Sequence, residues 1–364
     1  MNTQTDDRVE PLRLMQLMLS SQNGGAETFF EKLTLALADA GVRQCVVIEP
    51  DERREALFAG HPNIEVKPLR FRGLHEPLGR LRLHLLMRRW QPEAMLTWMS
   101  RAIKRAPTGY CPLIARLGGY YRVERYRKSD RLIGNTPDIV RYLREEGIPA
   151  EKTQCIPNFG EIAPCELDSD TARARLREEL KIPAEHRVLL ALGRLHEAKA
   201  HDTLIDALSK TDNTTLLIAG DGPLKAELEA QITRLGLDAR VHLLGWRRDT
   251  GYLFKACDIS VFPSRFEPFG NVVVESWAQQ RPLIAAASAG PTWLVSDNED
   301  GLLVPIDDST ALAERINRLV ADPALAERLV EAGYRTYRER FSREAVTAEY
   351  VAMLKEVITD YASR

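Results

Sequence analysis

Residues 259–279 read ISVFPSRFEPFGNVVVESWAQ and decide the fold of this chain. The apolar run at residues 259–262 predicts a buried strand, and residues 271–280 have the spacing of a helix. Gly270 permits a close approach of a ligand to the backbone, and Asn271 is a typical N-cap residue. Free N–H groups and the helix dipole at such a helix start favour an anion. The segment therefore predicts a strand, a ligand-binding loop and a helix in succession.

Two glutamates flank this loop, with seven residues between Glu267 and Glu275. Their carboxylates could hold hydroxyl groups on either side of a bound diphosphate, because hydrogen bonds to a charged acceptor are strong. The alternative is that both are solvated surface charges. Glu275 follows three valines, and a bare charge in an apolar stretch is costly, so we favour the functional interpretation.

The alternation of strand, turn and helix continues in both directions from this segment. Further strands are predicted at residues 12–19, 45–48, 65–69, 95–98, 113–117, 131–133, 188–192, 215–219, 241–244, 283–286 and 302–304. Helices are predicted at residues 26–40, 78–90, 136–147, 200–210, 223–236 and 250–258. This pattern predicts an α/β protein with two doubly wound, Rossmann-like parallel sheets that face one cleft. Ligands of such sheets bind at the carboxyl ends of the strands.

Length and composition limit the class of protein. The chain has 364 residues, which suggests two or three domains, and Pro, Gly and acidic residues place the linker near residues 158–185. A net charge of -2 and 44% hydrophobic residues are typical of a soluble globular protein and argue against a nucleic-acid binder. Five cysteines without zinc-like spacing indicate reduced thiols in the cytoplasm. The acidic N-terminus is unlike a signal peptide, and no apolar run approaches the roughly 18 residues of a membrane span.

Two further positions suit a phosphate group. Arg194 and Lys199 follow the predicted strand at residues 188–192, and a guanidinium and an ammonium there can clamp a diphosphate. Gly24 and Gly25 lie between the first strand and its helix, where phosphates approach the backbone. The alternatives are solvated surface charges for the first pair and a flexible turn for the second.

Residues 265–279 resemble the E-x7-E motif of retaining glycosyltransferases of family 4, which have the GT-B fold. The resemblance covers most of the chain and is weakest from about residue 50 to residue 130. It is carried by residues 23–41, 155–161, 192–208, 216–228, 241–249 and 300–308. It implies transfer of a sugar from a UDP- or GDP-linked donor to a hydroxyl of a glycan or glycolipid, with retention of configuration and without a metal. Cell-envelope glycolipid, of the lipopolysaccharide-core type, is the acceptor class that it suggests.

The resemblance also assigns roles to individual residues. Glu267, Arg194 and Lys199 would be catalytic. The donor would be bound by Gly24, Gly25, Gly220, Asp221, Gly222, Trp246, Phe269, Gly270, Asn271, Val272 and Glu275. Trp246 would lie beside the base, with core packing as the alternative.

The acceptor side departs from the family pattern. The family often has a histidine in the segment that aligns with residues 113–121, where this chain has Gly118 and Gly119, with Arg116 as the nearest charge. A histidine role is therefore in doubt, and the resemblance implies that the donor phosphate takes the acceptor proton. The expected domains are residues 1–165 for the acceptor and 166–342 for the donor. The helix at 343–364 is expected to pack back on the first domain.

Charge is distributed unevenly along the chain. Residues 70–131 contain 15 Lys or Arg and 4 Asp or Glu, a balance of +11 in a chain whose total is -2. The basic helix GRLRLHLLMRRW at residues 79–90 suits an anionic membrane surface or an anionic glycolipid. Its leucines are expected to pack on the sheet of their own domain. These features predict peripheral contact with the inner face of the cytoplasmic membrane.

Three other functions remain open at this point. A non-catalytic nucleotide-sugar-binding subunit would be expected to lack some of Glu267, Glu275, Arg194 and Lys199, which are all present. An epimerase of the same fold would convert the donor without an acceptor. A dinucleotide-dependent oxidoreductase needs G-x-G-x-x-G after the first strand, and residues 20–25 read SSQNGG instead.

Overall fold

The computed structural model describes residues 11–20, 24–162 and 164–364 of the chain. Half of the predicted loop SSQNGG, residues 21–23, lies outside the described residues. The chain forms two compact units, of which unit 1 comprises Met1–Asn158 with Val346–Arg364 and unit 2 comprises Phe159–Ala345. The divisions predicted after residues 165 and 342 lie seven and three residues from these boundaries.

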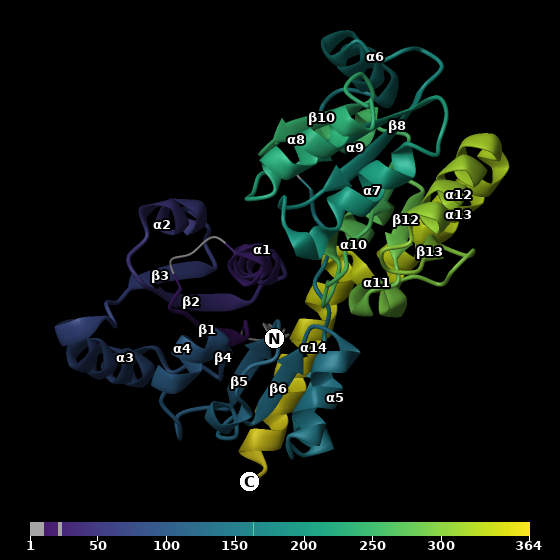
Figure 1. Cartoon of the computed structure of the whole chain (residues 1–364). Helices are drawn as coiled ribbons and strands as arrows, with labels where there is room; N and C mark the ends of the chain where they lie inside the picture. Colours follow the sequence, from purple (N-terminus) through teal and green to yellow (C-terminus); the bar gives the residue numbers. More distant parts are fainter. Residues whose placement is uncertain (1–10, 21–23, 163) are drawn as a thin grey trace, which may run out of the picture. The chain divides into compact units, whose positions relative to one another are not determined.

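In its described residues, unit 1 contains one sheet of seven parallel strands in the order β3-β2-β1-β4-β5-β6-β7 (Figure 1). The strands are β1 (Arg13–Met18), β2 (Arg43–Ile48), β3 (Ile64–Pro68), β4 (Ala94–Trp98), β5 (Leu113–Leu117), β6 (Arg131–Gly134) and β7 (Thr153–Cys155). The order reverses between β1 and β4, which is the topological switch point of the sheet. Every residue of β4 is buried, as expected where helices cover both faces.

The helices of unit 1 connect these strands. They are α1 (Gly25–Asp39), α2 (Glu52–Phe58), η1 (Gly73–His75), α3 (Glu76–Trp90), α4 (Met99–Arg105), η2 (Val123–Arg125), α5 (Pro137–Glu145), η3 (Ala150–Lys152) and α14 (Arg343–Ala362). The last helix packs on this unit as predicted. Arg116 Nε donates to Tyr350 Oη at 2.9 Å, and Arg131 forms an ion pair with Glu356 at 2.7 Å.

Unit 2 contains a second sheet, whose six parallel strands have the order β10-β9-β8-β11-β12-β13 in the described part of the chain. The strands are β8 (Arg187–Leu192), β9 (Thr214–Ala219), β10 (Val241–Gly245), β11 (Ile259–Phe262), β12 (Leu283–Ala286) and β13 (Leu302–Val304). The helices are α6 (Ser169–Leu180), η4 (Glu197–Lys199), α7 (His201–Leu208), α8 (Lys225–Arg234), α9 (Thr250–Ala256), α10 (Asn271–Ala278), α11 (Ala289–Leu294), α12 (Ser309–Ala321), α13 (Pro323–Thr336) and η5 (Tyr337–Phe341). The switch point of this sheet lies between β8 and β11. The prediction of two doubly wound parallel sheets is confirmed.

The segment predicted as a linker contains a packed helix. Residues 169–180 form α6, which is capped by the side chain of Asp168 and buries Ala172 and Leu176 in a cluster with residues of α9. The connection between the units is therefore shorter than residues 158–185. Pro, Gly and acidic residues precede this helix and give the segment the composition of a linker.

The expectation that the leucines of the basic helix pack on the sheet is wrong for Leu81 and Leu85, whereas Leu83 is buried and Leu86 packs against the core. The inward face of α3 is formed by Gly79, Leu83, Met87 and Trp90. The outward leucines, which we call the leucine stripe, are Leu74 (98% exposed), Leu78 (46%), Leu81 (56%) and Leu85 (56%). A spacing of three or four residues places them on one side of the segment from η1 through α3. In the described part of the chain, no helix is both long enough and apolar enough to cross a bilayer.

Candidate functional site

Lys199 and Glu267 meet at the switch point of unit 2. Lys199 ends η4, which follows β8, and Glu267 lies in the loop after β11. Lys199 Nζ and Glu267 Oε2 are 2.5 Å apart, and the side chains are only 24% and 16% exposed. The cation also lies 5.4 Å from the centre of the Phe262 ring. Folding thus places a fixed, partly desolvated ion pair where the crevice of such a sheet binds ligands.

Arg265 holds the loop that carries Glu267. Its guanidinium forms ion pairs with Asp202 of α7 at 2.6 Å and with Asp307 at 2.5 Å, and it donates to the carbonyl oxygen of Glu197 at 2.8 Å. The hydrogen bond to Asp202 raises the pKa of Arg265. Sequence reasoning missed this residue, because its partners lie about 40 and 60 residues away and only the fold brings them together.

Gly270, rather than Asn271, is the N-cap of α10. The backbone of Gly270 has φ +97°, a left-handed conformation that glycine adopts at low cost, and Asn271 is the first residue of the helix. Gly270 has no side chain that could cap the N-terminus of α10, so the predicted capping by Asn271 is wrong. The expectation that the first N–H groups of this helix suit an anion stays a prediction. Within α10, Val272 and Glu275 are half-buried and flank the buried Val273 and Val274.

Gly220 and Gly222 let two loops touch. A Cβ on Gly220 would lie 1.9 Å from the carbonyl oxygen of Gly193, and one on Gly222 would lie 2.3 Å from that of Leu195. The Leu195 N–H donates to the carbonyl oxygen of Asp221 at 3.1 Å, so the exposed Arg194 lies directly beside this contact. Packing within the protein therefore requires glycine at both positions, because a side chain at either one would push apart the loops that follow β8 and β9.

The two aromatic candidates differ in exposure. Trp246 is 73% exposed, so the alternative of core packing is wrong for it, and the backbone bond from Gly220 N–H to the Gly245 carbonyl oxygen (2.8 Å) holds it beside Gly220. Phe269 is 4% exposed and packs against Trp293 and Phe341. Its predicted contact with a donor is therefore restricted to its backbone. No three His, Cys, Asp or Glu residues in the described ranges gather to hold a metal ion.

The candidates of unit 1 follow β1 and β5. Gly24 is the N-cap of α1, and a Cβ on Gly25 would meet no atom within 4 Å. Arg116 is 3% exposed, bonds to Asn158 and Tyr350, and lies over the rings of Phe29 (4.4 Å) and Trp98 (5.0 Å). These contacts give Arg116 a packing role.

Gly118 is exposed and Gly119 is half-buried. A Cβ on either residue would meet no atom closer than 3.7 Å. Neither glycine is therefore required by close packing.

Comparisons with known proteins decide the family. Residues 172–336 match the family described as "Glycosyl transferases group 1". The chain is 36% identical over 337 residues to the lipopolysaccharide core biosynthesis glycosyltransferase LpsE of Rhizobium meliloti (strain 1021), covering 92% of this chain and 96% of LpsE. The chain belongs to the group 1 glycosyltransferases. LpsD of the same organism, also a lipopolysaccharide core biosynthesis glycosyltransferase, is 33% identical over 93% of this chain and 97% of its own length.

Solved structures share the fold of this glycosyltransferase. The crystal structure of Anabaena Alr3699/HepE in complex with UDP-glucose has a TM-score of 0.77 and 24% identity, covering 95% of this chain and all of that one. The fold is therefore GT-B, as the resemblance implied.

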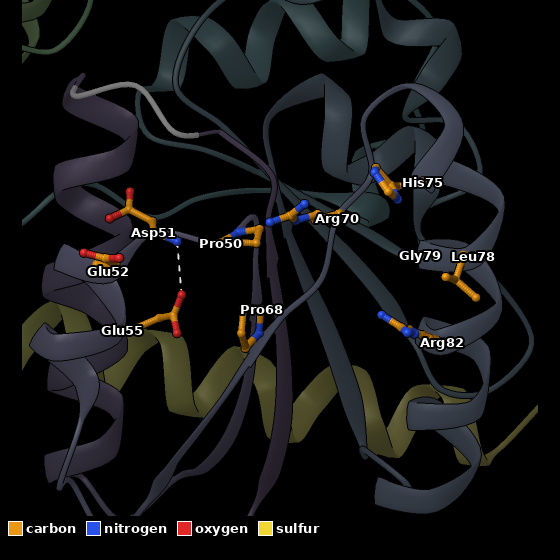
Figure 2. A pocket seen from close by; sticks show the side chains of 10 residues that line it. All are labelled: Pro50, Asp51, Glu52, Glu55, Pro68, Arg70, His75, Leu78, Gly79 and Arg82. Carbon is orange, nitrogen blue, oxygen red and sulfur yellow. Dashed lines mark hydrogen bonds between the residues drawn. The ribbon is translucent and has the colours of Figure 1, made fainter.

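Two pockets in unit 1 of this glycosyltransferase were not found from the sequence. The smaller, of about 270 Å³, contains Arg72, Trp98, Arg101 and Tyr121 in its lining. The larger, of about 520 Å³, lies between the β2–α2 and β3–α3 segments (Figure 2). The only indication of these pockets in the sequence was that the residues that line them follow predicted strands.

We expect the free energy of unfolding to fall as the pH drops from about 6.5 to about 4. Burial lowers the pKa of His201, at the start of α7, from 6.5 to about 4. In this window the unfolded chain binds a proton that the folded chain does not, so stability is lost as the pH falls, by about 3 kcal/mol at the acid end. Urea unfolding at pH 5 and pH 7 should show a smaller difference for His201→Gln than for the parent. His196→Gln, at an exposed position, is the control, and equal differences in all three proteins would contradict the expectation.

Proposed function

We propose that this glycosyltransferase transfers a hexose from a UDP- or GDP-linked donor to a hydroxyl of a glycolipid in lipopolysaccharide core assembly, with retention of configuration. The Lys199–Glu267 ion pair at the unit 2 switch point carries the proposal. The names of LpsE and LpsD support the acceptor class, and the complex of HepE with UDP-glucose supports the donor class.

The residues of unit 2 would divide the work as follows. Lys199 and Arg194 would neutralise the charge that develops on the departing diphosphate, which lowers the barrier because this charge is greatest in the transition state. The N–H groups at the start of α10 would add to that stabilisation. Glu267 holds Lys199 in place and would accept from hydroxyls of the donor sugar. The donor phosphate would take the acceptor proton.

Donor binding tests the proposal directly. UDP, UDP-glucose and GDP-mannose are added to the full chain at 100 times their dissociation constant, where one of them should add about 2.7 kcal/mol to the stability. The anomeric configuration of the product, read by NMR, tests retention. Activity in EDTA should equal that of the untreated enzyme, since the positive clamp is built from protein cations. If no nucleotide sugar stabilises the chain, the proposed function is wrong.

Glu275→Gln should weaken donor binding by about 1.5–3 kcal/mol, because it replaces a charge-assisted hydrogen bond to a ribose hydroxyl. Calorimetric titration with UDP measures the change. The matched control is Glu227→Gln in the first turn of α8, an exposed glutamate of the same unit. Unchanged affinity in Glu275→Gln would remove this residue from the donor site.

We also propose that unit 1 binds the anionic inner face of the cytoplasmic membrane in a peripheral manner. The leucine stripe on the η1–α3 segment supports this more strongly than the sequence alone did, because its side chains are exposed beside the basic residues of α3. A helix that presents leucines and arginines to solvent suits the boundary between lipid headgroups and acyl chains. Such contact would hold the enzyme beside a lipid-linked acceptor.

Vesicle binding should depend on the arginines of α3. Each basic residue near a negative leaflet contributes about 1 kcal/mol, and added salt screens the attraction. The test variant replaces Arg80, Arg82, Arg88 and Arg89 with Gln. The control variant makes the same change in charge in unit 2, at Arg234, Arg328, Arg335 and Arg338. Co-sedimentation with anionic vesicles at low salt should fall only in the test variant, and equal binding by both would disprove the role of α3.

A further inference from the structure

The smaller pocket of unit 1 lies at the switch point of its sheet. Leu19 and Ser20 follow β1 and line one side, while Trp98 ends β4 and Met99 begins α4 on the other. β1 and β4 are neighbours in the sheet where the strand order reverses, which is where doubly wound folds bind ligands. At about 270 Å³ the pocket is smaller than the roughly 300–1,000 Å³ of sites for drug-sized ligands, so it suits a single sugar ring.

Two arginines give this pocket a positive wall. Arg72 comes from the segment before η1 and Arg101 from α4. Arg101 Nη1 donates to the carbonyl oxygen of Leu19 at 3.0 Å, which fixes one edge of its guanidinium. Among the described residues of the lining, none is Asp or Glu. The nearby Glu27 is 4% exposed and accepts from Ser20 Oγ at 2.5 Å, so this carboxylate is buried next to the lining and is not part of it.

The rest of the lining suits a sugar. Tyr121, two residues after Gly119, adds an aromatic ring, and burial raises the pKa of its phenol, which therefore stays protonated at neutral pH and can donate a hydrogen bond. Met99 has φ +63°, a left-handed conformation that is strained for a residue with a side chain. Such strain is retained where the surrounding structure fixes it, often at ligand sites.

The larger pocket provides a contrast within the same unit. Figure 2 shows Asp51, Glu52 and Glu55 on one side of it, and Arg70 and Arg82 on the other. Its lining therefore carries both signs of charge. Arg70 lines the larger pocket and Arg72 lines the smaller one, and only one residue lies between these arginines in the sequence.

We propose that the smaller pocket binds an anionic sugar ring of the acceptor, one that carries a carboxylate or a phosphate, through Arg72 and Arg101. A guanidinium recognises either group with two parallel hydrogen bonds, which a neutral sugar cannot accept with a comparable strength. The inference rests on the proposed function, because it names the class of acceptor that the transferase would use.

Ligand-observed NMR titration of the full chain tests the inference. The probes are glucose, glucuronate, glucose 6-phosphate and inorganic phosphate. Glucuronate or glucose 6-phosphate should bind at least tenfold more tightly than glucose, and added salt should reduce the difference. Arg72→Gln and Arg101→Gln should each remove that preference. The matched controls are Arg70→Gln and Arg82→Gln, which make the same change in the larger pocket and should retain it.

The outcomes separate this inference from the proposed function. Comparable binding of glucose and the anionic sugars, or an equal loss in the control pair, would overturn it. Inorganic phosphate that binds as tightly as glucose 6-phosphate would also overturn it, because the site would then recognise a free anion. UDP binding is measured on the same samples and should be unchanged in all four variants. If neither UDP nor GDP binds the parent chain, the proposed function is wrong, whichever sugars bind to the smaller pocket.

Discussion

Lys199→Ala is expected to lower kcat by roughly a hundredfold to a thousandfold, the usual effect of removing one group that stabilises transition-state charge. The ammonium lies 2.5 Å from Glu267 and is mostly shielded from water, so its charge would act on a bound diphosphate with little screening. Arg194→Ala should also reduce kcat, although less, because Arg194 is exposed. Turnover of nucleotide sugar at saturating donor measures both effects.

The control for Lys199→Ala is Lys225→Ala, which removes an exposed lysine of the same unit. Its kcat should equal that of the parent. Thermal melts of all variants show whether lost activity reflects lost folding, since Lys199→Ala leaves Glu267 without the cation described above. A near-normal kcat for Lys199→Ala in a folded protein would reduce this residue to a structural partner of Glu267.

Gly220→Ala should lower the free energy of unfolding by about 3 kcal/mol or more and weaken donor binding as well. The added Cβ would lie 1.9 Å from the carbonyl oxygen of Gly193, and backbone rather than a flexible side chain must then move. Overpacking of this kind usually costs about 1–3 kcal/mol, and here the displaced loop also carries Arg194 and Lys199. Urea unfolding followed by circular dichroism measures the loss.

Gly25→Ala provides the matched control for stability. A Cβ at that position meets nothing within 4 Å, and residue 25 is the first of α1, so alanine should leave the unfolding free energy unchanged or raise it slightly. Equal destabilisation by the two substitutions would show that the contact between Gly220 and Gly193 does not determine the effect.

The sheets could be predicted from sequence because their strands are short apolar runs between turn signals. The runs at β5 and β11 gave the observed bounds, since buried parallel strands need apolar residues on both faces. β7 was missed, as its three residues, of which only Thr153 is buried, give no such run. α2 and α4 were not named as helices because their seven-residue sequences show no clear apolar period, whereas α9, of the same length, does.

The positions of the candidate site residues could be predicted where these residues lie in one stretch of sequence. They could not be predicted where folding brings together residues that are far apart in the sequence. The positions of Glu267, Gly270 and Glu275 follow from one strand, loop and helix. The partners of Arg265 are remote in sequence, and so are the residues that line the smaller pocket of unit 1. The exposure of Leu78, Leu81 and Leu85 could not be predicted either. The spacing of apolar residues shows that a helix has an apolar face, but it does not show that α3 has a second apolar face, which is exposed to solvent.

The return of α14 to unit 1 has a consequence for how the chain matures on the ribosome. Unit 1 is complete only when Val346 and the residues after it have been made, and 187 residues of unit 2 intervene. At synthesis rates of about 5–20 residues per second, the first sheet waits roughly 10 to 40 s for its last helix. During that time Arg116 lacks the hydroxyl of Tyr350, and the surface that later contacts Met353, Leu354 and Val357 is open to other apolar chains. We therefore expect nascent unit 1 to expose apolar surface for longer than unit 2, whose residues are contiguous in the chain.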